Sequence, residues 1–539
     1  MMEETITATT NAEVEKPRRR WRRRSEEYGS ILWVPFHLLR WVASVMWRNK
    51  VKSLVLLSVG LPTFWVFKPY FQPLVVNVRI LLPEILGFVI LVLVMRLLIK
   101  KGRYIPTLLI CGIVIAGLVA VIATNSKPHY YHTLYAQFKT LDKVSLEALP
   151  ETRFERIHPL NSIHTATNTR IADTLHTPVP DYVSWGDGDP HWTVGIEPAY
   201  PHQRFFGKVD RIFSLPGQSS LLEFGGENQI KVNFDSGETM YFTKDVSYLA
   251  RQSFAFWRFL SYEPSAMKYI PGPDGKMVQC VTLTKWDGFI FPRPHFGGVV
   301  IIKQSEGGFL KFIKRLFVGE GDWIRPEHIK NYDWLAGQNL VPYEVSRHVA
   351  NSFRFRYGYL APFPLTHYRD IRIPDLAGDV NEQPFTTFFS FGEGDARSKL
   401  YHYFALEPYQ DESRDKSGLS VSVFFPADGV GKLYYYEHAE RNENLAGVSS
   451  IATFIKQKAN TVDWSANDVA EHRPYIRKIN GTTRLCWIST IVTKTNVGEG
   501  FVAGSSIEVF VTDSSTTKPV KVDASKPSLW VSQIEEELK

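Results

Sequence analysis

Residues 191–200 read HWTVGIEPAY, and residues 401–410 read YHYFALEPYQ. In both stretches apolar side chains alternate with others and the run ends in Glu-Pro, so that Glu197 aligns with Glu407 at an offset of 210. An alternation with a period of two predicts a half-buried β-strand. Taken alone this likeness would be chance, so an internal repeat requires further landmarks in the same order.

Two further pairs of segments follow in the same order. Residues 277–283 (MVQCVTL) resemble 483–489 (TRLCWIS), which places Cys280 over Cys486 at an offset of 206. Between these landmarks, VSYLA at 246–250 resembles VSSIA at 448–452. Three landmarks at similar offsets predict two related halves, which we place at residues 126–335 and 336–530.

Each half is expected to contain two units, in which a helix precedes an antiparallel meander. The aromatic and β-branched composition of the apolar runs favours strands. A helix packed on one face of such a sheet gives an α+β module. The first strands are predicted at 192–196, 278–283, 403–406 and 485–490, the second strands at 211–215, 298–303, 419–425 and 507–512, short third strands at 309–313 and 432–436, and the helices at 160–175, 248–260, 343–355 and 448–458.

This pattern resembles the PepSY and cystatin-like group of small domains, in which a helix packs on a curved antiparallel sheet. The residues that carry the resemblance are the strands HWTVGIEP, QCVTLTK, HYFALEP and LCWISTI, and the runs VVIIKQSEGGFLKF and VSVFFPADGVGKLYYY. It would cover residues ~150–525 as four units. The resemblance implies a regulatory, inhibitory or adhesive domain, by analogy only, because a fold does not determine a function.

The N-terminal part of the chain is expected to be a membrane anchor. Residues 105–124 (IPTLLICGIVIAGLVAVIAT) contain no charge over about the 20 residues that cross a bilayer, and residues 80–99 are nearly as apolar. A third span is predicted at 53–67, which could cross the membrane or be re-entrant. We therefore expect a basic disordered tail at 1–30, an interfacial amphipathic helix at 31–50 and a transmembrane anchor at 51–125.

The charge is asymmetric along the chain. Residues 1–103 hold 17 Lys and Arg against 7 Asp and Glu, which gives +10 and leaves −3 for the rest of a chain whose formal charge is +7. Because phosphate neutralisation supplies most nucleic-acid affinity, an acidic globular part argues against a nucleic-acid partner. The bases are expected to set membrane topology or contact lipid headgroups, and they place the N-terminus in the cytoplasm. They are Arg18, Arg19, Arg20, Arg22, Arg23 and Arg24 before the spans, and Lys100, Lys101 and Arg103 between the second and third spans.

Two polar residues lie within the predicted second span. Glu84 is near its beginning, where a carboxylate complements the positive end of a helix, and Arg96 can reach toward the lysines that follow. An intramembrane carboxylate is also a candidate for moving protons or ions. The sequence leaves both roles open for this pair.

No catalytic, cofactor or metal site is predicted. The patterns of zinc proteases, serine hydrolases and nucleotide-binding loops are missing from the sequence. The alternative of a hydrolase using Asp189, His191 and His202 has no identifiable nucleophile. Cys280 and Cys486 could form one disulfide or stay as two independently buried thiols.

These features predict a non-enzymatic integral membrane protein. With three spans, the domain that follows residue 125 lies outside the cytoplasm, where it would bind an unknown protein partner or associate with copies of itself. The alternative is a channel- or transporter-associated subunit in which Glu84 and Arg96 line a path between spans. The lipid bilayer is the one partner predicted under both hypotheses.

Overall fold

The computed structural model describes residues 50–102 and 128–539, with gaps at 173, 186–188, 221–227, 306, 363–366, 368, 375–382, 392–398, 410–417 and 498–499, and the isolated positions 105, 109 and 112. The chain divides into two units, Met1–Lys68 and Pro69–Lys539. The second unit contains every strand. The six arginines at 18–24, Arg103, the predicted tail and the interfacial helix up to residue 49 lie outside the described residues, as does almost all of the predicted span at 105–124.

Two long helices precede the globular part. Helix α2 is Lys50–Ile80 and helix α3 is Leu82–Lys100. Among the described residues, α3 alone is long and apolar enough to cross a membrane, and it coincides within two residues with the span predicted at 80–99. The segment 53–67 lies inside α2, and its crossing of the membrane stays a prediction.

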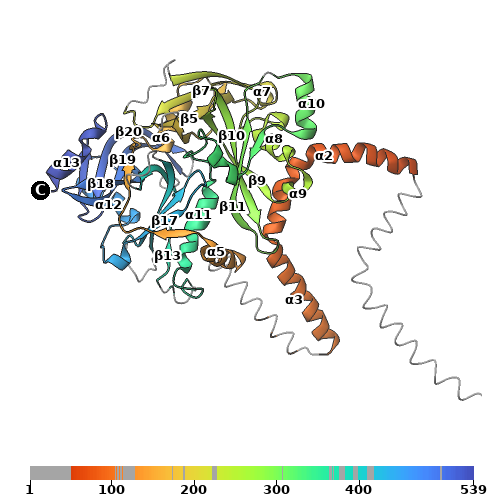
Figure 1. Cartoon of the computed structure of the whole chain (residues 1–539), viewed down its shortest axis with the longest axis horizontal. Coiled ribbons are helices and arrows are strands. Elements are labelled where there is room, and N and C mark those ends of the chain that lie inside the picture. Colours follow the sequence, from red (N-terminus) through yellow and green to blue (C-terminus); the bar gives the residue numbers. More distant parts are fainter. Residues whose placement is uncertain are drawn as a thin grey trace, which may run out of the picture. The chain divides into compact units, whose positions relative to one another are not determined.

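Four antiparallel sheets follow, and in each of them the main strands pair in the order in which they occur along the chain (Figure 1). Some neighbouring strands are joined by tight turns, as expected of meanders, whereas α7 lies between β5 and β7 and α10 lies between β11 and β12. The first sheet contains β4 (Asp181–Trp185), β5 (Asp189–Gly195), β7 (Val209–Pro216) and β8 (Gln229–Phe234), and the second contains β9 (Tyr262–Pro271), β10 (Met277–Asp287), β11 (Arg293–Ile302) and β12 (Asp322–Ile324). The third contains β14 (Phe385–Ser390), β15 (Lys399–Pro408), β16 (Val421–Pro426) and β17 (Leu433–Glu437), and the fourth contains β18 (Asn467–Ile479), β19 (Thr482–Val497), β20 (Gly500–Asp513) and β21 (Pro519–Val522).

The third sheet is extended by strands from elsewhere in the chain. Strand β1 (Lys143–Ser145) runs parallel to β17, and β2 (Glu151–Arg153) pairs with β14. Strand β13 (Ile371–Arg372) pairs with the end of β15, and a separate two-stranded ladder joins β3 (Leu175–His176) to β6 (Glu197–Pro198). Residues 143–153, which we expected in the first half of the domain, therefore complete a sheet of the second half.

Short helices lie between and beside the sheets. Before and within the first two sheets they are α5 (Pro128–Thr140), α6 (Leu160–Asn168), α7 (Pro201–Phe206), η2 (Phe242–Lys244), α8 (Val246–Ser253), α9 (Phe256–Phe259), α10 (Phe309–Val318) and η3 (Pro326–Asn331). Later in the chain they are α11 (Tyr343–Ser352), η4 (Phe353–Phe355), η6 (Ala439–Arg441), α12 (Val448–Lys458), η7 (Pro527–Leu529) and α13 (Trp530–Glu537). Helix α12 has the bounds predicted from sequence.

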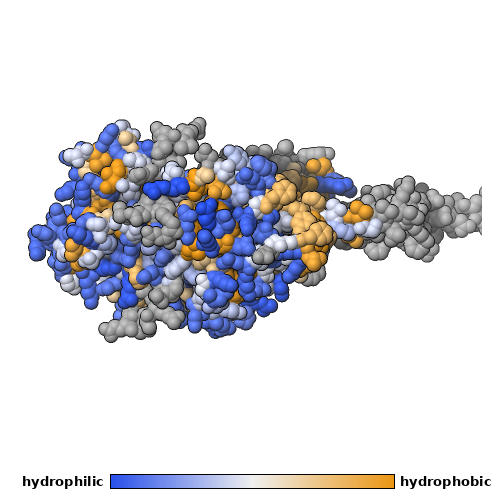
Figure 2. Space-filling model, turned by 90° about the horizontal axis from the view of Figure 1, so that it is seen from above, coloured by the Kyte–Doolittle hydropathy of each residue, from blue (hydrophilic) through white to orange (hydrophobic). Residues whose placement is uncertain are grey.

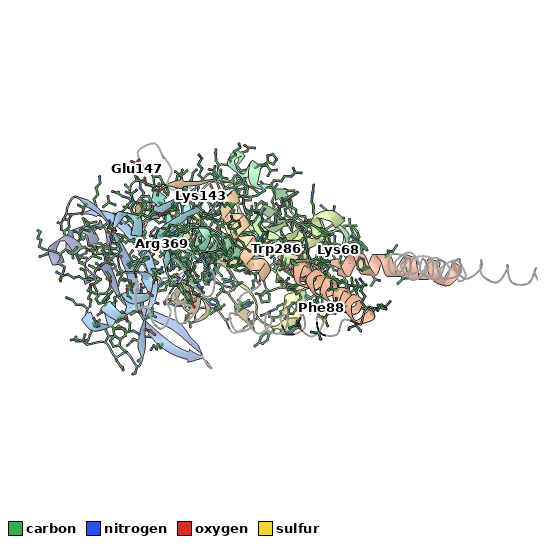
Figure 3. All side chains as sticks on the ribbon, turned by 90° about the horizontal axis from the view of Figure 1, so that it is seen from below. Lys68, Phe88, Lys143, Glu147, Trp286 and Arg369 are labelled. Carbon is green, nitrogen blue, oxygen red and sulfur yellow. The ribbon has the colours of Figure 1, made fainter. Side chains whose placement is uncertain are left out.

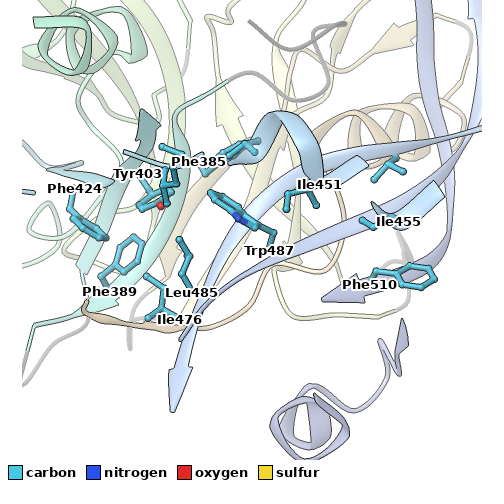
Figure 4. Packing of buried hydrophobic residues seen from close by; sticks show 14 of the residues in the cluster. Phe385, Phe389, Tyr403, Phe424, Ile451, Ile455, Ile476, Leu485, Trp487 and Phe510 are labelled. Carbon is cyan, nitrogen blue, oxygen red and sulfur yellow. The ribbon is translucent and has the colours of Figure 1, made fainter. Parts of the chain in front are cut away.

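The hydrophobic cores join the sheets to one another. Aromatic residues of the third sheet, Phe385, Phe389 and Tyr403, pack with Trp487 of the fourth sheet and with Ile451 of α12 (Figure 4). A second core lies between the first two sheets and α8. A third joins residues of the first sheet, Trp192 among them, to Phe388 of the third. The four sheets are therefore tied together by shared cores.

Each predicted first and second strand overlaps a strand of the structure, although residues 196, 303 and 419–420 fall just outside the observed strands. Cys280 is in the second strand of the second sheet and Cys486 is in the second strand of the fourth. One prediction is wrong: residues 309–313, expected as a short third strand, form the beginning of helix α10. The apolar residues of this segment face outward, which hid the helical pattern.

Candidate membrane-anchoring and partner-binding surfaces

Helix α3 is apolar and unburied along its whole length. None of its residues is buried by the protein, and side chains such as Phe88 extend away from the helix (Figure 3). Covering this apolar surface would stabilise the protein by about 25 cal/mol for each Å² removed from water. Glu84 lies in its first turn, while Arg96 is exposed four residues before the C-terminal Lys100, and Lys101 follows directly.

The end of α2 that leads into α3 is held on the globular domain by side chains. Gln72 is fully buried and donates from Nε2 to the carbonyl oxygen of Phe259 at 2.8 Å and to that of Tyr262. Arg79 donates from Nη1 to the carbonyl oxygen of Leu260 at 2.8 Å, and to the hydroxyl of Ser261. A charged donor that satisfies backbone carbonyls is stronger than a neutral one. The beginning of α3 is therefore fixed relative to the second sheet.

Helix α10 has its charged side turned inward. Arg315 is buried, and its guanidinium pairs with Asp235 at 2.7 Å and with Glu320. Lys311 pairs with the same Glu320 at 3.2 Å. Gln252 of α8 donates to the carbonyl oxygen of Leu316 at 2.7 Å. The polar side of this amphipathic helix thus faces the domain.

The opposite side of α10 is an apolar surface exposed to solvent. Phe309 is 76% exposed and Leu310 is 84% exposed, and the surface continues over Phe312, Ile313, Phe317 and Val318. Helix α7, whose Phe206 is 86% exposed, touches α10 through η2. Seen from above, hydrophobic side chains form a patch at the end of the domain where Figure 1 has α10 (Figure 2). Exposed apolar patches of this kind are typical of contact surfaces.

Two buried glutamates accept hydrogen bonds from segments further along the chain, Glu197 from the residues before η2 and Glu407 from the first turn of α12. Glu197 accepts hydrogen bonds from the backbone amides of Glu238 and Thr239 at 2.7 and 2.8 Å. Glu407 accepts from the amide and hydroxyl of Ser449, 42 residues further along, as Thr239 lies 42 residues after Glu197. Each carboxylate lies against a glycine at an offset of 40, Gly237 in the first half and Gly447 in the second. Burial raises the pKa of Glu407, and the hydrogen bonds from Ser449 oppose that rise.

Several histidines are used as buried hydrogen-bonding groups. His472 Nδ1 lies 2.7 Å from Ser489 Oγ on the neighbouring strand, and burial lowers the pKa of His472 to about 3. His402 is fully buried between Ser346 and Asn339, with both contacts at 2.9 Å. Such histidines are neutral at physiological pH and serve as polar parts of the core.

One network has the order of groups that a nucleophilic site requires, and sequence reasoning missed it. Ser422 Oγ lies 2.9 Å from His438 Nε2, and His438 Nδ1 lies 2.8 Å from Glu443. The serine, however, is fully buried and also bonds to the hydroxyl of Tyr403 at 2.8 Å. A surface hollow of about 300 Å³ reaches Glu443 and Tyr436 but is not lined by Ser422. A substrate carbonyl cannot reach this hydroxyl, so the network stabilises the third sheet.

The three residues of the alternative hydrolase hypothesis each contact other groups of the protein. His191 Nδ1 lies 2.9 Å from Ser214 Oγ and the ring stacks on Trp185. His202 is exposed on α7 and stacks on Tyr200. Asp189 begins β5 at an exposed position. Within the part of the chain that the structure describes, no group of three or more His, Cys, Asp or Glu side chains is arranged to hold a metal ion.

Both cysteines of the globular part are free, buried thiols in different sheets. Burial raises the pKa of Cys280 to about 12 and that of Cys486 well above its usual range. A thiol in this state is a poor nucleophile. Of the two alternatives left open by the sequence, the structure shows independent thiols.

Comparison of the chain with protein-family profiles, with curated proteins and with solved structures finds no match. The resemblance to PepSY and cystatin-like domains therefore stays a prediction. The surfaces described above are the basis for a functional proposal.

Proposed function

We propose that this chain is an integral membrane protein that holds a large α+β domain at a membrane surface, where the domain acts by binding rather than by catalysis. The observation that carries the proposal is α3, an apolar helix of 19 residues with no buried side chain. At about 1.5 Å per residue it is about 28 Å long, which is close to the thickness of the hydrocarbon core. The hydrogen bonds of Arg79 and Gln72 would hold the domain at a fixed position relative to the bilayer.

We further propose three spans, with the domain outside the cytoplasm. Lys100 and Lys101 lie at the C-terminal end of α3, and bases at the end of a span favour the cytoplasmic side. With that end inside, α3 enters the membrane from the side on which the domain lies. A third crossing at 105–124 returns the chain to the same side, where α5 and the sheets follow.

The binding surface in this proposal is the outward side of α10. Its inward charges are neutralised by Asp235 and Glu320, so the helix is held with its apolar side exposed. A convex apolar ridge with Lys314 exposed on it fits an apolar groove with an acidic rim, a common mode of helix recognition. The likeness of HWTVGIEP to YHYFALEP, and of the segments around Cys280 and Cys486, supports an origin of the two halves by duplication, and duplicated modules suit binding and assembly.

The anchoring part is tested by extraction of cell membranes with alkaline carbonate, followed by protease treatment of intact cells or spheroplasts. We expect the full chain to stay in the carbonate pellet and the domain to be digested from outside. Release into the supernatant would contradict anchoring by α3. Protection of the domain until lysis would contradict the proposed orientation while leaving the anchor intact.

The binding part is tested with Leu310→Glu in the full-length protein, because residue 310 is the most exposed apolar position of α10 and makes no inward contact. Lys276→Gln, at an exposed position of the turn between β9 and β10, is the control for removal of a surface charge without loss of apolar surface. We expect Leu310→Glu to abolish binding to the natural partner, or association between copies in detergent, and the control to keep it. Equal behaviour of both variants would contradict a role for this surface.

A further inference from the structure

The connection between β10 and β11 is an apolar turn. The last paired residues of the two strands are Asp287 and Arg293, and the turn between them reads GFIFP. Phe289 is 76% exposed, and Ile290 and Phe291 are also exposed. Gly288 begins the turn with a φ of +95°, a conformation that glycine adopts without strain. Three successive apolar side chains at a solvent-exposed turn are unusual, because turns of soluble proteins are mostly polar.

This turn is held at the beginning of α3. Arg79 donates from Nη2 to the carbonyl oxygen of Gly288 at 2.6 Å, while its Nη1 bonds to Leu260 and Ser261. Arg79 precedes the first residue of α3, Leu82, by three residues, which correspond to about 4.5 Å along a helix. The turn therefore lies at the level at which the candidate span begins.

The same turn also contacts the helix that follows the predicted span at 105–124. The ring of Phe291 lies 4.7 Å from that of His132 in the second turn of α5, and Arg293 donates to the hydroxyl of Thr140 at the end of α5. Tyr131 of α5 donates its hydroxyl proton to the carbonyl oxygen of Tyr359, beside Leu360, which is 70% exposed. The exposed side chains of Phe291, Tyr359 and Leu360 thus lie near the first two turns of α5, whose other side packs on α11.

We propose that the turn at 289–291, together with Tyr359 and Leu360, inserts into the headgroup region of the bilayer that α3 crosses. This inference rests on the proposed function in one respect, the crossing by α3. If α3 fills the hydrocarbon core, Leu82 lies at its boundary and Arg79 lies among the headgroups. The turn is bonded to Arg79, so Phe289 and Ile290 reach the same boundary. Aromatic residues are enriched at that level of membrane proteins.

A lipid surface fits this feature better than a protein partner does. The apolar side chains named here number five, whereas a stable protein interface uses about 20–30 residues on each side. A shallow insertion of a few aromatic side chains beside a span needs no such area. The contact would fix the tilt of the domain on the membrane, because it adds a second attachment to that of α3.

The test uses full-length protein in vesicles of phosphatidylcholine and phosphatidylglycerol, with an environment-sensitive fluorophore on one introduced cysteine in a Cys111→Ser background. Cys280 and Cys486 are buried and do not compete for the label. The probe positions are Phe289→Cys in the turn, Phe88→Cys in α3 as the positive control, and Asp274→Cys as the negative control. Residue 274 lies in the turn at the other end of β10, about 35 Å away along an 11-residue strand.

Each labelled protein is exposed to lipids that carry a nitroxide on the acyl chain, and separately to iodide in the aqueous phase. We expect the lipid nitroxide to quench the probes at 289 and 88 several-fold more than the probe at 274, and iodide to show the reverse order. Quenching at 88 without quenching at 289 would overturn the inference and leave the anchor in place.

Two other outcomes would also overturn the inference. Shielding of residue 289 from both quenchers would instead mean that a second copy of the chain covers the turn. Failure of the lipid nitroxide to quench the probe at 88 would remove the proposed anchor and this inference together. The three probes therefore separate failure of the turn from failure of the span.

Discussion

The buried histidine His472 provides a quantitative test of the fourth sheet. It is 2% exposed on β18, and burial lowers its pKa to about 3, with Arg473 and Lys456 lowering it further and Asp468 opposing them. In the unfolded chain the pKa of a histidine is about 6.5. Between these values the unfolded state binds a proton that the folded state does not bind. Stability is therefore fully present above pH 6.5 and is lost as the pH falls toward 3.

The magnitude follows from the two pKa values. At pH 7 the unfolded histidine is mostly neutral, and its partial protonation lowers the free energy of unfolding by only about 0.2 kcal/mol. At pH 5 the difference of 1.5 pH units from 6.5, at about 1.4 kcal/mol per unit, gives about 2 kcal/mol. Other groups of the protein also titrate in this range, so the total stability does not isolate His472. The effect of His472 is isolated by comparing the free energy of unfolding of the wild type with that of a variant that has no titratable group at residue 472.

The perturbation is His472→Asn, because the amide of asparagine can replace Nδ1 as partner of the Ser489 hydroxyl. The free energy of unfolding is measured by urea titration of the full-length protein in detergent, followed by tryptophan fluorescence, at pH 7 and pH 5. We expect the advantage of the wild type over the variant to shrink by about 2 kcal/mol between these pH values. The control is His202→Asn at an exposed position of α7. A wild-type advantage that stays constant within 0.5 kcal/mol, on the order of the scatter of such measurements, would refute the assignment of His472 as a neutral core residue.

Three further predictions follow from other parts of the structure. Gly447→Ala is expected to destabilise the protein by about 2 kcal/mol in the same urea assay, because a Cβ there would overlap the carboxylate of Glu407, and Gly237→Ala should do likewise, where the Cβ would lie 2.6 Å from Glu197 Oε1. Gly418→Ala is the control, because its Cβ would lie 3.7 Å from the nearest atom, the carbonyl oxygen of Leu445. Equal stability of all three variants would contradict the close packing of Glu197 and Glu407 against these glycines. Cys280 and Cys486 are expected to resist a maleimide reagent in native protein and to react after unfolding, as read by mass spectrometry, and rapid native labelling would contradict their burial. Glu84→Gln is expected to leave membrane insertion and vesicle proton permeability unchanged, since the residue lies in the first turn of α3, whereas loss of a proton or ion flux would favour the alternative of a channel- or transporter-associated subunit.

The strand pattern could be predicted because these strands bury one or both faces in a regular way. The alternation in HWTVGIEP and the apolar run QCVTLTK lie in β5 and β10, and their Glu-Pro and cysteine landmarks occupy comparable places in the two halves. The edge strands were beyond prediction. Strands β1 and β2 are three residues long and join a sheet whose other strands begin more than 200 residues later. A pairing over that distance leaves no local signal in the sequence.

The anchor shows a different limit. The mostly apolar run at 80–99 predicted α3, because an apolar run of about 20 residues has few other uses. Hydropathy could not reveal how the anchor meets the domain. That junction depends on Arg79 and Gln72, two polar residues between the segments predicted as spans at 53–67 and 80–99, and on carbonyl groups of residues 259–262. Their partners are set by the tertiary fold.

Helix α10 buries charged side chains and exposes apolar ones, the reverse of the usual arrangement. The segment FLKFI was predicted as a strand on the assumption that apolar residues point inward. In the structure Arg315 and Lys311 point inward instead, and Asp235 and Glu320 neutralise them. In most soluble proteins charged side chains are exposed and phenylalanine is buried, and α10 shows the opposite arrangement. Such exceptions are found mainly at functional surfaces. If no partner covered the apolar side of α10, replacing Leu310 by a polar residue would leave both the stability and the binding of the protein unchanged. The exposed apolar side of α10 is therefore the surface at which we propose that a partner binds.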